Sequence, residues 1–487
     1  MRNQRQHEQG TAAPATSEAQ CPSANAQASA VGPDVSPPAP WPLAESDRSA
    51  PPRLHVPNRQ QLLSAKIIDE LLEADHPARA VWAYVEALDL TLLYEDIRAR
   101  GRHAGRPATD PRVLVALLLY ATFAGFTSDR EIADLCQHHD AFRWLAGGVA
   151  VNHHTLSDFR TDKPEFLEQL LKQSVEVLRQ KGLTDLDRIA QDGMRVRASA
   201  GAASFRRRAT LERLLKEAQD DIKRLREQLA AYAADPTATQ GVTTEQTPAE
   251  VAQGAREQAT AMQHAEDRLD RLERAMERLP EMEAKIAPAD NKEARVSTTD
   301  PEATVMKMAD GGYRPAYNIE YATACQGMAI GGVDVVTTGN DQGQLPPMLE
   351  QIENRFDTRP KEALIDGGFV KFADIEEVQG APKKTTVYAP VPKPKKEGID
   401  RYAPKASDSA EVAEWRQRMG TEEAKNTYKA RGATAECVNA QARNRGLQQF
   451  AVRGLQKVKA VATWFAIAHN MARSFSLDHQ PPGLAHS

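Results

Sequence analysis

Between residues 188 and 389 the sequence alternates between short apolar segments with strand character and amphipathic helical segments. The expected helices cover 345–356 and 372–378, and the expected strands cover 188–196, 317–323, 328–338, 363–366 and 385–389. Strands that alternate with helices in this way build an α/β core, because each helix must bury its apolar face against a sheet. This alternation limits the possible folds more than any other feature of the chain.

Two helical runs with heptad-spaced apolar residues interrupt the alternation after its first strand. The apolar positions are spaced 4, 3, 4, 3, 4 in the first run, and a polar loop at about 233–249 separates the runs: Leu211, Leu215, Ala218, Ile222, Leu225 and Leu229, then Met262, Ala265, Leu269, Leu272, Met276 and Leu279. Stripes of this kind bury their seam against another helix. Residues 205–285 are therefore expected to form an antiparallel coiled-coil hairpin inserted into the α/β core.

The segment before the core, residues 58–185, has mainly helical patterns. Good helix formers open it at 60–72, Asp110-Pro111 is a helix start, and Ser128 with Glu131 has the spacing of a capping box. The short helices expected around and after this box fit a helix-turn-helix and an ordinary helical bundle equally well.

Composition excludes several classes of protein. Residues 1–52 include 11 Ala and 9 Pro, and so few large apolar side chains that a disordered tail is expected. The longest apolar run, 113–126, is shorter than the about 20 residues needed to cross a bilayer. The N-terminus lacks the apolar stretch of a secretory signal. We therefore expect no membrane association.

The cysteines favour a reducing compartment. They are far apart and form no CxxC motif, which argues against a disulfide scaffold and a structural zinc site: Cys21, Cys136, Cys325 and Cys437. The chain carries 62 Lys and Arg against 67 Asp and Glu, a net charge of −5. This balance excludes a uniformly basic protein, but an average leaves room for strong local fields.

Three acids stand out by their context. Asp192 lies inside the first strand, Asp366 ends a strand before two glycines, and Glu436 lies inside a helix. A carboxylate in a core strand needs compensation, and Mg²⁺ prefers such oxygen ligands. Two such ions about 3.5–4 Å apart can promote phosphodiester cleavage. The alternative is that three of 67 acids are grouped by chance and that Asp366 merely shapes a turn.

A basic region surrounds Glu436. From Lys429 to Arg473 the chain has eight Lys and Arg and one Glu, a local net charge of +7. Arg443 follows Glu436 by seven residues, close to two helical turns, so the two share a helix face. A cation for phosphate beside a carboxylate for metal favours nucleic-acid chemistry over a merely solvated charged face.

Several stretches together resemble one family. From about residue 60 to 475 the chain resembles bacterial insertion-sequence transposases of the DDE class, specifically the group with a Tyr-Arg-Glu-Lys signature in the last catalytic helix. The likeness is carried by GRPATDPRVLVALLLYATFAGFTSDREIADL (105–135), DGMRVRASA (192–200), VSTTDPEATVMKMADGGYRPAYN (296–318), LIDGGF (364–369), YKARGATAECVNAQARNRGLQQFAVRGLQKV (428–458) and AHN (468–470).

The resemblance implies an RNase H-like catalytic domain at 186–475. Asp192, Asp366 and Glu436 would be its catalytic acids and would hold two Mg²⁺ ions, for which Mn²⁺ could substitute. The implied reaction is metal-dependent DNA cleavage at the element's terminal inverted repeats, followed by strand transfer into target DNA. Residues 58–185 would be the N-terminal DNA-binding domain.

The resemblance also implies partners and DNA contacts. Double-stranded DNA and further copies of the chain would be the partners, in the bacterial cytoplasm at the nucleoid. The expected DNA-binding residues are Tyr428, Arg431, Arg443, Arg445, Arg453 and Lys457. Arg443 stands where the family usually has Lys, and a planar guanidinium binds phosphate differently from a point charge. Arg206-Arg207-Arg208 and Lys393-Pro394-Lys395-Lys396 are further candidates for backbone contacts.

Four other features complete the expectations. Asp334 could support the site, whereas Asp341 is expected to cap a helix and Asp310-Gly311-Gly312 to form a turn. His469-Asn470 is expected to be a buried, satisfied polar pair. Two rival functions remain. One is a catalytically inactive DNA-binding protein derived from a transposase, and the other is a structural protein built on the coiled coil.

Overall fold

A computed structural model describes residues 54–60, 62–63, 66–100, 107–234, 248–286, 293–394 and 398–478. The tail expected at 1–52 and the basic residues Lys395-Lys396 lie outside these described residues.

The centre of the α/β core is a six-stranded mixed sheet with the order β10-β9-β5-β11-β12, in which β8 also pairs with β9. β5 pairs antiparallel with β9 and parallel with β11, so it joins the two halves of the sheet. The strands are β5 (Arg188–Arg197), β8 (Thr304–Lys307), β9 (Tyr313–Ala324), β10 (Ile330–Val336), β11 (Glu362–Leu364) and β12 (Thr386–Tyr388). This sheet confirms the expected α/β core and the order of its strands.

Side-chain alternation along the strands builds a hydrophobic cluster on each face of the sheet. Met194 and Val196 of β5 pack in the cluster that includes helices α3 (Pro111–Ala124) and α15 (Leu455–Asp478). Ile189 packs in the other cluster, with α10 (Leu345–Phe356) and α11 (Phe372–Gly380). The expected helices at 345–356 and 372–378 are therefore confirmed.

Helices dominate the N-terminal segment, as expected: α1 (Pro77–Glu86), α2 (Thr91–Glu95), α3, α4 (Asp129–His138), α5 (Asp140–Ala146), α6 (His153–Thr161) and α7 (Pro164–Gln180). Asp110 caps α3 by accepting from the Arg112 amide, and Ser128 caps α4 by accepting from the Glu131 amide. Both helix starts were predicted. Their interiors supply Val113 and Ile132 to the hydrophobic core.

The prediction of a helix at 60–72 is wrong. The chain forms short strands β2 (Leu62–Leu63) and β3 (Lys66–Ile67) and a 3₁₀ turn η1 (Ile68–Leu71), and β1 (Leu54–His55) pairs with β4 (Ala108–Thr109). Ile68 is buried in the core, and the Asp69 carboxylate accepts from Arg79 and Trp144. These tertiary contacts outweigh the weak local preference for helix.

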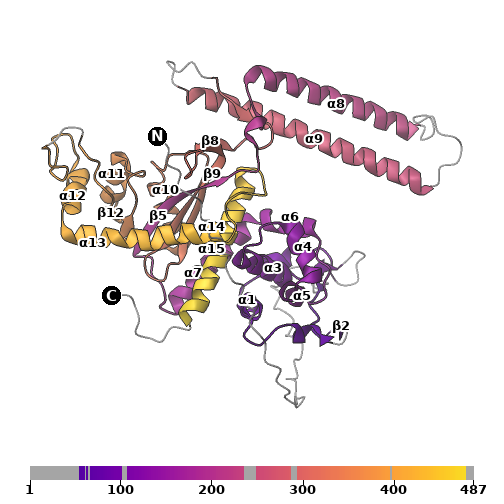
Figure 1. Cartoon of the computed structure of the whole chain (residues 1–487), viewed down its shortest axis with the longest axis horizontal. Coiled ribbons are helices and arrows are strands. Elements are labelled where there is room, and N and C mark those ends of the chain that lie inside the picture. The colour runs from indigo at the N-terminus through magenta and orange to yellow at the C-terminus, as the bar shows by residue number, and fades with distance from the viewer. Residues whose placement is uncertain are drawn as a thin grey trace, which may run out of the picture. The chain divides into compact units, whose positions relative to one another are not determined.

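Helices α8 (Arg208–Ala234) and α9 (Pro248–Ala284) follow β5 and run side by side (Figure 1). Leu211 and Leu272 share one hydrophobic cluster between them. The ion pair Arg208–Glu283 joins the start of α8 to the end of α9, and Arg268–Asp221 joins their middle parts, so the helices are antiparallel. The 3₁₀ turn η2 (Ala202–Ser204) and the strand pair β6 (Phe205–Arg206) and β7 (Val296–Ser297) lie at their base.

The C-terminal region is helical: α12 (Ala410–Met419), α13 (Glu422–Arg431), a π-helical turn η3 (Gly432–Glu436), α14 (Cys437–Asn444) and α15. Gly446 and Gly454 have φ of +84° and +89°, values that favour glycine, and they interrupt this helical region. In α15 the fully buried Asn470 bonds to both backbone groups of Ile330. His469 is also fully buried, which confirms the expected burial of the pair, but its Nδ1 has no hydrogen-bond partner among the described residues.

No single described helix is long and apolar enough to cross a membrane; α3 and α4 meet the criterion only as a pair bent by 101°.

Candidate active site

The site lies where the parallel and antiparallel halves of the sheet separate. β5 pairs with β11 only through residues 188–190, whereas its pairing with β9 continues past Asp192. Asp192 therefore lies just beyond the end of the parallel ladder. Asp366 follows the last residue of β11 by two positions, and Gly368 and Phe369 donate backbone N–H groups to its Oδ1. The end of one ladder thus brings both aspartates to the same part of the sheet.

A single guanidinium links the three acids singled out in the sequence. Nη2 of Arg431 lies 2.9 Å from Asp192 Oδ1 and 3.9 Å from Asp366 Oδ2, and its Nη1 lies 3.3 Å from Glu436 Oε1. The structure thus brings Asp192, Asp366 and Glu436 together around a buried cation. Glu436 is the most open of them, with 67% of its side chain exposed against 17% for Asp192.

The π-helical turn η3 explains how Arg431 reaches Glu436. On a regular α-helix, residues five apart point in different directions. In a π-helix the hydrogen bonds run between residues five apart, so such residues lie one above the other. η3 begins directly after Arg431 and ends at Glu436, and it packs on β5 and β9. A local change of helical pitch therefore turns Arg431 and Glu436 to one side.

Asn439 is a site residue that the sequence reasoning missed. Its Nδ2 donates to Asp192 Oδ2 at 2.9 Å, so each oxygen of Asp192 has a donor. Asn439 is 4% exposed, and its Oδ1 has no hydrogen-bond partner among the described residues. Its position three residues after Glu436, on the same helix face, was the available signal.

The electrostatics reflect crowded negative charge. Burial raises the pKa of Asp192 to about 6; Arg431 opposes this shift, and the charges of Asp366 and Asp341 add to it. Burial also raises the pKa of Glu320 on β9 to about 9, with a contribution from Asp341, so Glu320 is protonated at neutral pH. Fixed carboxylates near one another, with a single guanidinium among three of them, favour the binding of a further cation.

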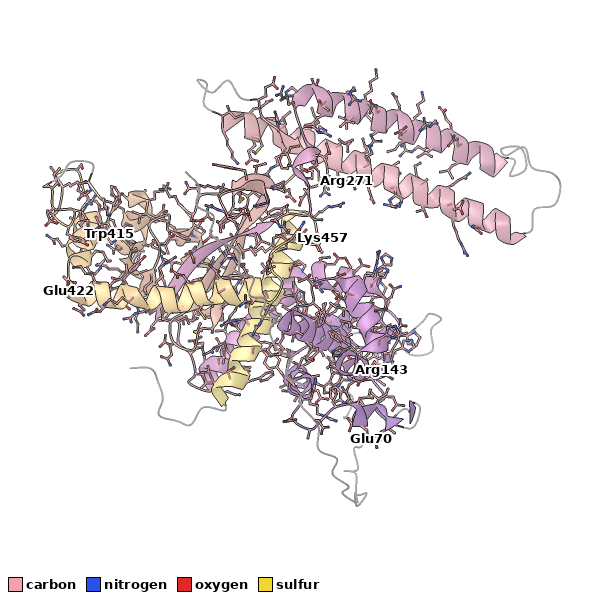
Figure 2. The ribbon with its side chains drawn as sticks, viewed as in Figure 1. Glu70, Arg143, Arg271, Trp415, Glu422 and Lys457 are labelled. Atoms are coloured by element: carbon pink, nitrogen blue, oxygen red, sulfur yellow. The ribbon has the colours of Figure 1, made fainter. Side chains whose placement is uncertain are left out.

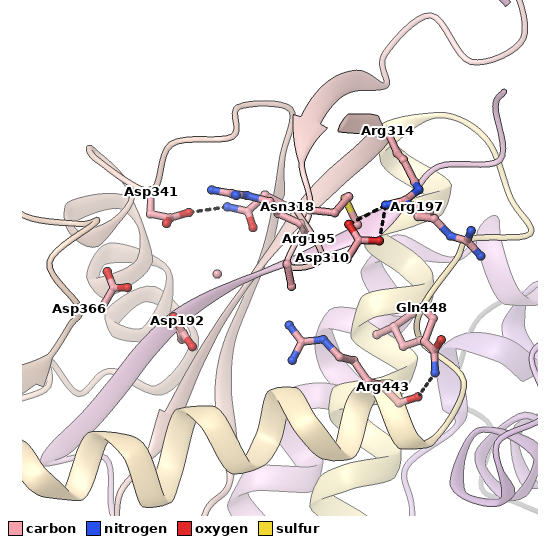
Figure 3. A pocket seen from close by; sticks show the side chains of 14 residues that line it. Asp192, Arg195, Arg197, Asp310, Arg314, Asn318, Asp341, Asp366, Arg443 and Gln448 are labelled. Atoms are coloured by element: carbon pink, nitrogen blue, oxygen red, sulfur yellow. Dashed lines mark hydrogen bonds and ion pairs between the residues drawn. The ribbon is translucent and has the colours of Figure 1, made fainter. Parts of the chain in front are cut away.

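A groove of about 570 Å³ runs past these carboxylates. Figure 3 shows Asp192, Asp366 and Asp341 toward one end of it and Arg197 and Arg314 toward the other. The expected turn at 310–312 is confirmed and borders the groove: Asp310 accepts from the Gly312 amide, and Gly311 has a φ of +81°. Arg314 pairs with Asp310 at that end, whereas Arg197 and Arg443 form no ion pair among the described residues and suit a phosphate chain that leads to a reacting centre.

The expected DNA-binding residues divide into exposed and internal groups. Arg443 is exposed and lines the groove, and Lys457 is exposed at the start of α15 (Figure 2). Arg445 stacks on Phe123 with its guanidinium 5.1 Å from the ring centroid, and burial lowers its pKa.

Two of the remaining expected DNA contacts bond or pack within the protein. Arg453 is exposed and donates to the Ser199 carbonyl, whereas Tyr428 is half-buried at the edge of a hydrophobic cluster. In the Arg206–Arg208 run, Arg207 and Arg208 pair with Glu293 and Glu283.

Two further acids, Asp341 and Asp334, differ in whether they reach the groove. Asp341 does not cap α10, because Gln344 is the N-cap residue and makes no side-chain capping bond. Asp341 instead lines the groove and accepts from Asn318. The sequence shows a polar run before a helix but cannot show that a distant strand supplies the donor. Asp334 pairs with Lys459 of α15 and is not among the groove-lining residues.

The fold and the site define an α/β protein whose mixed sheet carries a convergent carboxylate centre next to a basic helix. Comparison with known families finds a transposase domain at residues 66–162 and a transposase DDE domain at residues 395–475. The second segment contains Arg431 and Glu436. These two matches support an insertion-sequence DDE transposase. Neither a curated protein nor a solved structure matches it.

Proposed function

We propose that this transposase binds the terminal inverted repeats of its element and catalyses metal-dependent DNA strand cleavage and strand transfer. The observation that carries the proposal is the convergence of Asp192, Asp366 and Glu436 on one guanidinium. Strand order 10-9-5-11-12, with the first acid on the central strand, supports an RNase H-like core at 186–475. The antiparallel pair α8–α9 supports a coiled-coil hairpin inserted within 205–285.

The carboxylates fit divalent cations. Three carboxylates lie within reach of one small cationic group, and Asn439 Oδ1 is a buried acceptor without a described partner. Among the described residues no ready-formed group of three metal ligands exists, and the Arg431 guanidinium lies among the acids. Asp192, Asp366 and Glu436 would hold Mg²⁺. When bound, it would supply the positive charge that activates an attacking oxygen and stabilises a leaving one.

The chain's own residues would position the DNA. In the proposed reaction water attacks a phosphodiester at the element's end and leaves a 3′-OH, and that hydroxyl then attacks a target phosphodiester. Arg443 at the groove would hold the phosphate backbone near Asp192. Lys457 and Arg453 would extend this contact along the strand. Residues 58–185, with α4 to α6, would bind the inverted repeats.

Two copies of the chain would be needed to pair the two ends of one element, so we propose a homo-oligomer on DNA at the bacterial nucleoid. The hairpin within 205–285 is the segment we assign to contact with a second copy or with DNA.

A cleavage assay on DNA with the element's own ends, in Mg²⁺, tests the proposal. Asp192→Asn, Asp366→Asn and Glu436→Gln should each lower the cleavage rate by on the order of a thousandfold or more. When catalytic groups act as one unit, loss of any one of them removes most of the rate enhancement. Asp334→Asn is the matched control, because this acid lies on the same sheet but pairs with Lys459. Retention of wild-type cleavage by the three variants would refute the site, and specific DNA binding without cleavage by the wild type would favour the catalytically inactive alternative.

A further inference from the structure

We propose that Asp341, held in place by Asn318 and given room by Gly193, is a fourth carboxylate ligand for the divalent cation of this site. The proposal rests on the proposed function and adds a residue that neither the sequence pattern nor the family comparison assigns. Asp341 lies in the connection between β10 and α10, a segment outside both matched transposase domains.

Asp341 and Asp366 face the same space. The two carboxylates border one point above Gly368, where a Cβ atom would stand. Asp341 Oδ2 lies 3.3 Å from that point and Asp366 Oδ1 lies 3.0 Å from it. Figure 3 shows Asp341, Asp366 and Asp192 in this part of the groove. Both carboxylates thus border a position that has no side chain, so no Cβ atom there keeps a cation from the two oxygens.

Gly193 makes this approach possible. Its φ does not lie in the left-handed region, so its backbone conformation does not require glycine. A Cβ atom at this position would lie 2.7 Å from Asp341 Oδ1 and 3.0 Å from the side-chain oxygen and nitrogen of Asn318. Real Cβ atoms do not come so close to such groups, so any side chain at 193 would displace the Asp341 carboxylate.

Buried polar groups around Asp341 also lack partners. Asn318 is 1% exposed, and its Nδ2 donates to Asp341 Oδ1 at 2.6 Å and to Glu320 Oε1 at 2.7 Å. The Oδ1 atom of Asn318 has no hydrogen-bond partner among the described residues, and neither has Oε1 of the fully buried Gln191. Buried acceptors without donors are rare in folded proteins, and a cation or its bound water would satisfy them.

The ion pairs of the acids in the site also support a cation beside Asp341. Arg431 pairs with Asp192, Asp366 and Glu436, whereas Asp341 forms no ion pair with a lysine or arginine in the described parts of the chain. Its neighbours are the Asn318 amide and the Glu320 carboxyl, so no described positive group offsets its charge.

The test measures Mn²⁺ binding to the full chain by the electron paramagnetic resonance of free Mn²⁺, and melting in EDTA. Asp341→Asn keeps the shape and an acceptor for Asn318. It should weaken Mn²⁺ binding about tenfold or more and melt at or above the wild-type temperature in EDTA, because it removes repulsion from Asp366. Gly193→Ala should weaken binding in the same direction, and Asp334→Asn should match the wild type.

The outcomes separate this inference from the proposed function. If Asp341→Asn binds Mn²⁺ like the wild type while Asp192→Asn does not, Asp341 is no ligand and the three-acid site stands. If Asp341→Asn melts lower in EDTA and keeps its Mn²⁺ affinity, its role is structural and the inference is overturned. If the wild type binds no Mn²⁺, the metal site of the proposed function fails, and the inference fails with it.

Discussion

Arg431 and Asp192 are 239 positions apart in the sequence, yet Arg431 Nη2 lies 2.9 Å from Asp192 Oδ1. The same guanidinium reaches Asp366 and Glu436. Without a bound metal, Arg431 is the group that balances three carboxylates. A divalent cation and this guanidinium would compete for the same oxygens, which gives Arg431 opposite effects on stability and on metal affinity.

Replacing Arg431 should therefore destabilise the metal-free protein. Arg431→Ala leaves the largely buried Asp192 and the more exposed Asp366 and Glu436 without their cation. It should lower the free energy of unfolding in EDTA by about 2 kcal/mol, less than the loss for a fully buried pair. Its affinity for Mn²⁺ should rise, because the competing group is gone. Urea denaturation in EDTA and a Mn²⁺ titration measure the two effects.

Arg443→Ala is the control, since this exposed side chain forms no ion pair in the described parts of the chain. Equal unfolding free energies for Arg431→Ala and Arg443→Ala in EDTA would contradict the balancing role of Arg431.

Asn439 should matter for catalysis through Asp192. Asn439→Ala removes the donor to Asp192 Oδ2 and frees the carboxylate to rotate. Loss of a group that orients a ligand typically costs about 10–100-fold in activity, so the strand-cleavage rate should fall by that factor. Asn444→Ala, an exposed position at the end of the same helix, should cleave like the wild type. A rate for Asn439→Ala equal to that of Asn444→Ala would show that Asp192 needs no such support.

The sequence predicts the parts of this site that depend on local pattern. Alternation locates β5 with Asp192, and α10 begins and ends at the expected residues. The prediction of a helix at 60–72 is wrong because Asp69 contacts Arg79 and Trp144, and such tertiary contacts cannot be predicted from the local sequence.

The roles of two site residues, Asn439 and Asp341, could not be predicted from the sequence for a related reason. Asn439 and Asp341 acquire their roles from partners on β5 and β9. The π-helical turn between Arg431 and Glu436 has no composition that distinguishes it from an ordinary helix. The local sequence pattern predicts where helices and strands lie, whereas the tertiary packing of distant segments determines which side chains come into contact.

His469 should make stability depend on pH. It is fully buried in α15, Nε2 lies 2.8 Å from the Met328 carbonyl, and Nδ1 has no partner among the described residues. Burial lowers its pKa from 6.5 to about 4. The unfolded chain therefore binds the proton more readily, so stability is full above about pH 6.5 and declines as the pH falls toward about pH 4.

Between about pH 7.5 and about pH 5 this histidine should account for a loss of about 2 kcal/mol. The measurement is urea denaturation of the wild type, of His469→Gln and of His154→Gln, which alters an exposed histidine. The His469 variant should be less sensitive to pH than the wild type, and the His154 variant should behave like the wild type. Identical pH dependence in all three would rule out the buried histidine as the cause.

Arg443 and Arg445 are two positions apart and should affect DNA binding in different ways. Arg443 is exposed at the groove, whereas Arg445 stacks on Phe123 of α3. Loss of one phosphate contact lowers the salt dependence of binding, so Arg443→Ala should weaken DNA binding and reduce the slope of log K against log salt by about 1. Arg445→Ala should instead lower the melting temperature and leave the slope unchanged. The slopes come from fluorescence anisotropy at several salt concentrations, with Asn444→Ala as the neighbouring uncharged control. A reduced slope for Arg445→Ala, or an unchanged one for Arg443→Ala, would show that the DNA follows a path other than the groove beside Asp192.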